Sequence, residues 1–571
     1  MRVARVLPDV TGLDKTFDYS IPDGWDVPLG ALVRVGLHGR RVGGWVVALD
    51  PTDAHSGRLE PLAKITGRGP NPELIELAEW AAVRWAGRAR HFLGAASPPR
   101  AVTRVPAAQV TGSVVEPRSP ASTRVLASGG GLLRLPPTSD PLPAVLSAIA
   151  CGPTLVVVPS VDQATLLAAR LRRSGLSVAV VPDDWARAAG GVDVVIGARR
   201  AAWAPCAEMA AAVLLDEHDE ALQEEASPTW HARDVLIERC RRAGVPLLAV
   251  SPCPTLSAIA AFGAPVRPPR DRERAGWPIV EVIDRTDEEP WKRSLLTSRL
   301  IAELRDPERT VVCVSNTTGR AALLACRACR ALARCERCDA AVVLTDDDVL
   351  ACRRCGLERP AVCRECGAGR FANLRPGVTR LAEELEAAAG RPVELVTAAT
   401  NERPRPAGVY VGTEAVLHRV ERASTVAFLE FDRELLAPRY RAGEQAMALL
   451  VRAATLVGRR DAGGRILVQT FVPEHPVLRA AVIPDPGRLA DHERAAREQF
   501  RLPPFGAYAE ISGTGSSDFM ATVPRDGVQV AADGPQAWIA RADDWMVLGA
   551  ALNAGIRPSG ARLRIAVDPP R

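Results

Sequence analysis

Eight of the thirteen cysteines in this 571-residue chain form four Cys-x-x-Cys pairs within one central segment. The pairs are Cys326/Cys329, Cys335/Cys338, Cys352/Cys355 and Cys363/Cys366. Two residues between the sulfurs let one tight turn present both thiolates to a tetrahedral ion, and two such turns complete a four-cysteine site. A single pair could serve redox chemistry, and a small secreted protein could use the cysteines for disulfides, but four consecutive pairs in a long chain favour metal binding. The pattern predicts two Zn²⁺ ions per chain.

Spacing alone does not decide which pairs share an ion. The segment between Cys338 and Cys352 holds an apolar run, 340–344, and an acidic turn, 345–348, which is typical of a β-hairpin with one cysteine pair at each end. Such a hairpin is the usual zinc-ribbon arrangement, so it favours one site from the central pairs and a second site from the outer pairs. The predicted ligand sets are Cys335, Cys338, Cys352 and Cys355 for one ion and Cys326, Cys329, Cys363 and Cys366 for the other. Since the segment 312–369 contains no aromatic side chain on which a base could stack, we interpret it mainly as a structural and docking element.

A second chemical signal is an apolar run, Ala211 to Leu215, that ends in Asp216 and Glu217. A strand that ends in Asp-Glu is what nucleotide-hydrolysing folds use to hold Mg²⁺ and to orient the attacking water. These two residues are therefore the candidate nucleotide-binding pair.

The phosphate-binding loop that should accompany this pair is missing. Such a loop needs Gly-x-x-x-x-Gly-Lys-[Ser/Thr], but the chain has no lysine between Lys64 and Lys292. Where the loop should lie, Pro136 and Pro137 remove backbone N–H donors, and Arg134 offers charge without a nest of amides. We therefore expect a degenerate nucleotide site, no bound ATP and no catalytic residue.

Composition describes a globular protein of several domains. Hydrophobic residues make up 47% and charged residues 24% of the chain, and the net charge is +5. We find neither a signal-peptide pattern at the N-terminus nor a run of eighteen apolar residues, so we expect a cytoplasmic protein. Nearly all basic residues are arginine, which grips phosphates bidentately and is compatible with nucleic-acid binding.

The elements that must position these residues change in type along the chain. Residues 15–22 and 30–49 alternate between apolar and polar positions, which predicts a β-rich N-terminal domain followed by a helical segment, Asn71 to Arg88. From about residue 125, short apolar runs alternate with helical patterns in two successive series, which predicts two doubly wound parallel sheets. The cysteine pairs lie inside the second series as an insertion.

Two such lobes with Asp-Glu at a strand end resemble the RecA-like lobes of superfamily 2 helicases, and the insertion narrows the resemblance to the PriA family of replication restart proteins. The segments that carry it extend over nearly the whole chain. They are KTFDYSIPDG, PTWHARDVLI, the four cysteine pairs, VQTFVPEHPVL, FRLPPFG and the final VDPP. The implied fold is α/β, with a β-rich DNA-binding domain, two helicase-type lobes, a double zinc module and a small α+β C-terminal domain.

The resemblance implies a domain plan. It is a 3′-end DNA-binding domain (1–105), a linker (106–127), lobe 1 (128–272), lobe 2 (273–325 and 369–480), the zinc insertion (326–368) and a C-terminal domain (481–571). The winged-helix domain of the family is expected to be absent or vestigial, because the linker is too short for one.

The resemblance also implies a role for the N-terminal domain, which in the family captures the 3′ end of a nascent strand at a fork. Phe17 would stack on the terminal base and Asp18 would hydrogen-bond it. The alternative is that Phe17 is an ordinary core residue of a strand. Alternation places Phe17 and Asp18 on opposite faces, so both cannot lie in the core. A departure from the family is Glu60, at the position of a family lysine.

Further departures from the family concern the motifs that a helicase uses to hydrolyse ATP. The acidic motif reads Asp216-Glu217-His218-Asp219 where the family has Asp-Glu-Glu-His, the coupling motif reads Ser251-Pro252-Cys253 where the family has Ser-Ala-Thr, and only Gly458-Arg459-Arg460 remains of the arginine motif of the second lobe. Members of the family from high-GC bacteria are similar in this loss. The leading hypothesis is a non-catalytic protein that binds abandoned forks with a 3′ end and promotes primosome assembly with single-stranded DNA-binding protein and the helicase-loading machinery. The alternatives are an active ATP-dependent 3′ to 5′ helicase with atypical motifs and a protein-binding zinc scaffold.

Overall fold

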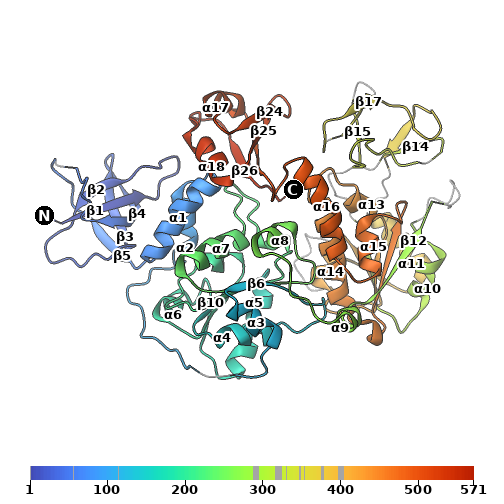
Figure 1. Cartoon of the computed structure of the whole chain (residues 1–571), viewed down its shortest axis with the longest axis horizontal. Helices are drawn as coiled ribbons and strands as arrows, with labels where there is room; N and C mark the ends of the chain where they lie inside the picture. Colours follow the sequence, from blue (N-terminus) through green and yellow to red (C-terminus); the bar gives the residue numbers. More distant parts are fainter. Residues whose placement is uncertain are drawn as a thin grey trace.

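The computed structural model describes residues 2–55, 57–112, 115–286, 295–315, 324–329, 331–345, 349–352, 354–373, 378–396 and 404–570. Figure 1 shows the N-terminal sheet at one end of an elongated molecule, two α/β lobes side by side, and the C-terminal domain above the first lobe. The cysteine-rich module lies above the second lobe.

The N-terminal domain is a five-stranded antiparallel sheet followed by two helices. Its strands have the order β2-β1-β4-β3-β5. The elements are β1 (Val3–Pro8), β2 (Phe17–Ser20), β3 (Leu32–Leu37), β4 (Arg40–Leu49), β5 (Lys64–Gly67), α1 (Pro72–Arg84) and α2 (Ala89–Ala96). Alternate residues such as Val6, Val33 and Val46 form its own apolar core, which is the half-buried pattern that the sequence predicted.

The helical segment predicted from Asn71 to Arg88 is helix α1, which ends at Arg84, and a second helix, α2, follows from Ala89. Asn71 caps α1, since its side chain accepts a hydrogen bond from the backbone N–H of Leu74 at 3.0 Å. The helix cannot continue past Trp85 because Ala86 takes a left-handed conformation, φ 46°, before α2 begins. The apolar face of α1 packs against helix α18 (Trp545–Ala554) of the C-terminal domain.

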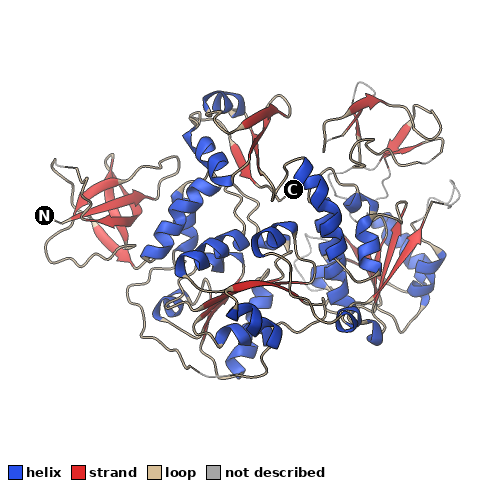
Figure 2. Cartoon of the chain, in the orientation of Figure 1, coloured by secondary structure: helices blue, strands red, loops and turns tan. Residues whose placement is uncertain are grey.

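Lobe 1 is a six-stranded sheet in which every strand pair is parallel. Its elements are α3 (Pro120–Ala127), β6 (Gly130–Arg134), α4 (Leu142–Ile149), β7 (Thr154–Val157), α5 (Val161–Arg173), β8 (Val178–Val180), α6 (Trp185–Gly190), β9 (Val194–Gly197), η1 (Arg199–Trp203), β10 (Ala211–Leu215), η2 (Glu220–Leu222), α7 (Ala232–Ala243), β11 (Leu247–Ser251) and α8 (Leu256–Phe262). Strands β7, β9, β10 and β11 are buried along their whole length, because helices cover both faces of the sheet (Figure 2).

Lobe 2 repeats this architecture, and helix α9 (Arg270–Ala275) joins the two. Its elements are β12 (Ile279–Asp284), α10 (Ser298–Arg305), β13 (Val311–Val314), α11 (Val378–Ala389), β19 (Val393–Val396), β20 (Val409–Gly412), α12 (Val416–Arg419), β21 (Thr425–Phe428), α13 (Asp432–Leu435), α14 (Ala442–Val457), η3 (Arg460–Ala462), β22 (Arg465–Thr470) and α15 (Pro476–Val482). The sheet orders are β6-β11-β10-β7-β9-β8 and β12-β22-β21-β13-β20-β19. When the strands are renumbered within each lobe, leaving out the insertion, both orders read 1-6-5-2-4-3. The predicted tandem lobes are thus present with identical topology.

The remaining elements are an insertion and a C-terminal domain. The insertion contains β14 (Leu324–Cys326), β15 (Val343–Leu344), β16 (Val349–Ala351), β17 (Glu358–Pro360) and β18 (Phe371–Asn373). The C-terminal part contains α16 (Gly487–Gln499), β23 (Ala507–Ser512), α17 (Ser516–Thr522), β24 (Gln529–Ala532), β25 (Ala537–Ala542), α18 and β26 (Arg564–Val567), with the sheet order β24-β25-β23-β26.

Near two of the predicted domain boundaries, a helix packs on the neighbouring lobe. The stretch predicted as linker, 106–127, ends in α3, where Val125 and Leu126 are buried in the core of lobe 1. The C-terminal domain was predicted from residue 481, but Leu489 of α16 lies in the core of lobe 2. In both places a helix with few apolar residues packs on a lobe, which local composition does not reveal.

Buried ion pairs join the two lobes. Arg134 at the end of β6 is only 2% exposed and pairs with Glu273 of α9, Nε to Oε1 at 2.6 Å, and with Asp485 beyond α15 at 3.2 Å. Arg134, which lies near the position expected for a phosphate loop, therefore forms ion pairs that join the lobes.

A second tie involves three charged residues of α14 and α16. The Glu444 carboxylate of lobe 2 accepts a hydrogen bond from the backbone N–H of Leu256 in the first turn of α8, at 2.7 Å, so lobe 2 caps a helix of lobe 1. Arg497 pairs with Glu444 at 2.8 Å and also binds Glu493. Two carboxylates thus share one buried guanidinium.

This sharing makes the tie sensitive to pH. Burial and the neighbouring Glu444 raise the pKa of the Glu493 carboxyl from 4.5 to about 7, although Arg497 opposes the shift. The folded state therefore holds a proton that the unfolded chain has released, so the contribution of this group is present below pH 4.5 and is lost as the pH rises to about 7. We expect Glu493→Gln to stabilise the protein above neutral pH by on the order of 1–3 kcal/mol, with the gain disappearing in acid.

Thermal unfolding at about pH 5 and about pH 8 measures this difference. Glu498→Gln is the control, because Glu498 lies on the same helix and is 50% exposed. An equal loss of stability at both pH values in the Glu493 variant would contradict the prediction.

Candidate functional site

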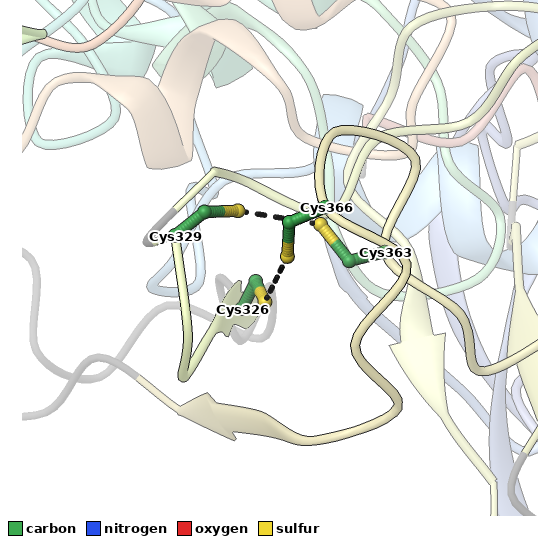
Figure 3. Close-up of side chains that lie close together, drawn as sticks. All are labelled: Cys326, Cys329, Cys363 and Cys366. Atoms are coloured by element: carbon green, nitrogen blue, oxygen red, sulfur yellow. Dashed lines mark hydrogen bonds between the residues drawn. The ribbon is translucent and has the colours of Figure 1, made fainter.

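The insertion brings its eight paired cysteines into two groups of four. One group is Cys326, Cys329, Cys363 and Cys366, and the other is Cys335, Cys338, Cys352 and Cys355; in each, the sulfur atoms all lie within 4.8 Å of one another. These are the two sets that the sequence analysis proposed. Figure 3 shows the first group, in which the four side chains converge on a common centre.

The donor geometry fits a tetrahedral metal ion. Sulfur–sulfur distances are 3.6 Å for Cys326/Cys366, 3.5 Å for Cys329/Cys363, 3.4 Å for Cys335/Cys355 and 3.5 Å for Cys338/Cys352. A Zn–S bond of about 2.3 Å implies an S–S edge of about 3.8 Å, whereas a disulfide is about 2.05 Å long. Both groups could therefore hold a metal ion, and the all-thiolate donor set suits zinc.

Backbone amides prepare these sulfurs to bind as thiolates. The N–H groups of Ala328 and Arg337 donate to the Sγ atoms of Cys326 and Cys335, each at 3.4 Å. In the second group, the thiol of Cys338 and nearby backbone N–H groups lower the pKa of Cys352 to about 4, against the effect of burial. The thiolate form that zinc requires is thus favoured at Cys352, whereas the contact with Cys352 and burial raise the pKa of Cys338.

The hairpin predicted between the central cysteine pairs is present as β15 and β16, which pair antiparallel, and β17 adds a third strand. The backbone N–H of Ala341 donates to the carbonyl of Leu436 in lobe 2 at 2.6 Å, and Ala341 lies in the core of that lobe. The module is therefore docked on lobe 2 rather than separate from it.

A cavity of about 640 Å³ lies between the lobes, where the sequence placed the nucleotide site. Its lobe 1 wall includes Pro136, Pro137 and Asp216, and its lobe 2 wall includes His418 and Arg452. Seven acidic side chains line it against three arginines: Asp216, Asp219, Glu220, Glu224, Glu225, Glu414 and Glu434, with Arg199, Arg439 and Arg452. A triphosphate would meet a predominantly negative wall.

The first residue of the acidic motif is held by a side chain of lobe 1. Asp216 has φ 51°, a left-handed conformation directly after β10, and its Oδ2 accepts a hydrogen bond from Gln163 of α5 at 2.8 Å. His218 Nδ1 lies 2.9 Å from the Ser251 hydroxyl, so the acidic and coupling motifs are still in contact despite their changed sequences.

Glu217, the second residue of the acidic motif, forms a buried ion pair. Glu217 is 0% exposed and Arg233 is 4% exposed, with Oε1 and Nη1 2.8 Å apart. The hydroxyl and backbone N–H of Thr255 also donate to Glu217, at 2.6 and 3.2 Å. Burial alone would lower the pKa of Arg233, but Asp234 and Glu217 raise it above its ordinary value, so the arginine stays charged. Both carboxylate oxygens of Glu217 thus have partners within lobe 1.

The end of the chain closes the same cleft. The Asp568 carboxylate accepts hydrogen bonds from Tyr440 and Arg441 of lobe 2, each at 2.6 Å. Gln223 of lobe 1 donates to the Asp568 carbonyl at 2.5 Å, and Gln445 of α14 donates to the Pro570 carbonyl at 2.8 Å. The final residues therefore bridge the two lobes beside the acidic motif.

In the N-terminal domain, Phe17 begins strand β2 and is half-buried, with one side against the core of the sheet. Lys15 Nζ lies 5.8 Å from the centroid of its ring. Both interpretations of Phe17 are compatible with this position, because the ring packs on the core and yet keeps exposed surface.

The carboxylate of the neighbouring Asp18 forms an ion pair with Arg5 within the sheet. Its carboxylate faces Arg5 across the β1–β2 pair, with Nε–Oδ1 at 2.8 Å and Nη2–Oδ2 at 3.1 Å, and accepts from the His55 backbone N–H at 2.9 Å. The Arg5 guanidinium lowers the pKa of Asp18 against burial, and the side chain is only 8% exposed. The predicted base contact would have to use the remaining acceptor capacity of this carboxylate.

The sequence departure at Glu60 affects the same surface. A Cβ atom at Gly36 of β3 would lie 2.6 Å from the Glu60 carboxylate, so this acid is held close against the strand. Tyr19 of β2 donates to the Gly36 carbonyl at 2.8 Å. A negative group therefore stands where the family resemblance implies a positive one.

Sequence reasoning missed the partners of the motor residues, although two lie in segments that it singled out. Arg233, which binds Glu217, belongs to PTWHARDVLI, and Asp568, which binds Arg441, belongs to the final VDPP. Gln163, the partner of Asp216, carried no signal. Two distant segments that resemble the same family are therefore worth testing for contact with the site residues.

Comparison with known proteins identifies the class first. Residues 5–98 match the family model of the PriA 3′ DNA-binding domain. Together with the two parallel sheets, this match defines an α/β protein of two similar lobes whose N-terminal domain is similar to a 3′ DNA-binding domain. Among solved structures, S. cerevisiae Dbp5 bound to RNA and ADP BeF3 aligns over 67% of this chain and 93% of that chain, with 9% identity and a TM-score of 0.36. The assignment of the lobes rests on their own shared strand order.

Several similar curated proteins are named replication restart protein PriA. The Bacillus subtilis protein is 25% identical over 58% of this chain and 45% of its own length, and the Synechocystis protein is 25% identical over 64% and 49%. The probable PriA of Mycobacterium tuberculosis CDC 1551 is 29% identical over 88% of this chain and 85% of its own length. The resemblance to PriA predicted from the sequence is confirmed, although the chain spans only about half the length of the first two relatives. Within the described residues, no helix is both long and apolar enough to span a bilayer.

The metal centres can be tested by removing one ligand. We expect the wild type to hold two zinc ions per chain and Cys335→Ser to lose about one of them, with a lower melting temperature because metal binding contributes folding free energy. Metal analysis and thermal unfolding measure both effects. Cys151→Ser is the control, since Cys151 is exposed and lies outside both groups. A wild type without zinc would refute the assignment.

Proposed function

We propose that this protein is a replication restart factor that binds abandoned replication forks at a nascent 3′ end and promotes primosome assembly without acting as a motor. The observation that carries the proposal is the PriA 3′ DNA-binding domain at residues 5–98, joined to lobes similar to PriA over most of the chain. Within this domain Phe17 offers a half-exposed ring to the terminal base, while Asp18 is held in place by Arg5.

The proposed loss of motor activity is supported by what the motor residues do instead. Glu217 is buried in its pair with Arg233, and Arg134 is buried in ion pairs that join the lobes. A hydrolytic site needs a free carboxylate for the metal and water, and positive groups that face the phosphates. The interlobe cavity is lined by seven acidic side chains against three arginines, so a triphosphate would meet few positive groups there.

In this proposal the two cysteine groups hold zinc, and the module they stabilise, docked on lobe 2, is a contact surface for the assembly machinery. Single-stranded DNA-binding protein and the helicase-loading proteins are the proposed partners, and the cytoplasm is the proposed location. The lobes then act as a scaffold that fixes the DNA-binding domain relative to the zinc module.

The motor is tested by ATP hydrolysis. We expect no DNA-stimulated turnover and no change on Asp216→Ala, because no phosphate loop is available to position a nucleotide beside this carboxylate. Phosphate release with forked DNA, with and without the substitution, is the measurement. Robust turnover that disappears in the Asp216 variant would instead establish the atypical helicase.

Recognition of the 3′ end is tested at Phe17. Loss of one base–aromatic stack costs about 1–3 kcal/mol, so Phe17→Ala should weaken binding to a fork with a free 3′ end by roughly 5- to 150-fold. Binding to the same fork with a blocked 3′ end should change little. Phe500→Ala is the control, since Phe500 is 49% exposed and lies in the C-terminal half. A wild type that binds no fork at low salt would favour the protein-binding scaffold.

A further inference from the structure

A cluster of basic side chains lies where three parts of the chain meet. Arg88 and Arg90 stand at the beginning of α2, and Arg557 belongs to the C-terminal domain. Electrostatically, Arg88, Arg557, His91 and Arg90 all act on the carboxyl of Asp14, in the loop between β1 and β2. Figure 1 shows α1 between the N-terminal sheet and the C-terminal domain.

Backbone and side-chain contacts fix the cluster in place. Arg557 Nη2 donates to the Ala86 carbonyl at 2.6 Å, at the break between α1 and α2. Arg88 Nη1 lies 3.9 Å from the position of a Cβ atom at Gly12 of the β1–β2 loop. Arg90 reaches the Thr11 hydroxyl of the same loop at 3.3 Å. The basic groups therefore face one loop from two domains.

The positive charge of this cluster is only partly balanced by the nearby Asp14 and Asp9 carboxylates. Among the described residues, Arg88 and Arg557 form no ion pair, whereas Arg90 approaches Asp9 at 3.8 Å. Burial and the neighbouring Arg88 lower the pKa of Arg557, and Asp14 offsets this only in part. Holding like charges together costs free energy that an anion would recover.

We propose that Arg88 and Arg557 form a phosphate-binding site for the DNA backbone at the junction of the N-terminal and C-terminal domains. Arginine binds phosphate oxygens bidentately, and two guanidinium groups on one loop suit a phosphodiester. The loop they face runs directly into Lys15 and Phe17, so it links the backbone contact to the end-binding strand. The inference rests on the proposed function, because it supplies a phosphate contact for the same DNA.

The test is fork binding by the full chain as a function of salt. Each phosphate contact contributes about 0.9 to the slope of log affinity against log salt. Arg88→Ala should weaken fork binding and reduce this slope by about 1, equally for free and blocked 3′ ends. Arg88→Lys should retain the slope while losing affinity, because the charge remains but the bidentate geometry does not.

Asp14→Asn is a second, independent test. Because it removes the carboxylate that opposes the arginines, it should strengthen fork binding. Arg525→Ala is the matched control, because Arg525 also donates to a backbone carbonyl, that of Met520 at 2.8 Å, within the C-terminal domain. Thermal unfolding verifies that each variant folds. If Phe17→Ala weakens binding while Arg88→Ala and Asp14→Asn change neither affinity nor slope, this inference is wrong and the proposed function stands. If the wild type binds no fork, both are wrong.

Discussion

A carboxylate without any contact with water must have a fixed partner, and Glu217 is such a group at the centre of this protein. Its pair with Arg233, supported by Thr255, lies just after β10, where the sequence predicted a nucleotide-binding pair. Removing one partner from a buried pair costs about 3–5 kcal/mol, so the sequence cannot vary one side alone. The same contacts fix the beginning of α8, which the other lobe caps through Glu444. A residue type retained from a catalytic motif thus supports the packing of the cleft.

Other parts of the chain converge on the same place. Arg134 joins β6 to α9 and to Asp485, and the terminal residues join both lobes through Asp568. Each tie crosses between units that a motor must move relative to one another. A fixed pair of lobes would instead hold the 3′ DNA-binding domain and the cysteine-rich module in a constant relation, which is what an assembly platform requires.

The architecture was predictable because its signals are local. Buried apolar runs indicated the parallel strands, alternation indicated the N-terminal sheet, and the hairpin pattern between the central cysteine pairs favoured the two cysteine groups. The misses have physical reasons. Helix α1 ends before the predicted Arg88 because Ala86 is left-handed, which the apolar pattern does not disclose, and α3 carries too few apolar residues to separate it from a linker. The partners of Asp18 and Glu217 are set by strand register and by contacts between distant segments, which no single window contains.

The claim that the lobes are tied rather than motile is tested most directly by the distance between them in solution. Spectroscopic labels at Leu166 of α5 and Val482 of α15, which are 69% and 44% exposed, would report on lobe 1 and lobe 2. Pulsed distance measurements with forked DNA, before and after addition of Mg²⁺ and a non-hydrolysable ATP analogue, should give one unchanged distribution. A shift to a closed distribution on addition of the nucleotide would contradict the account.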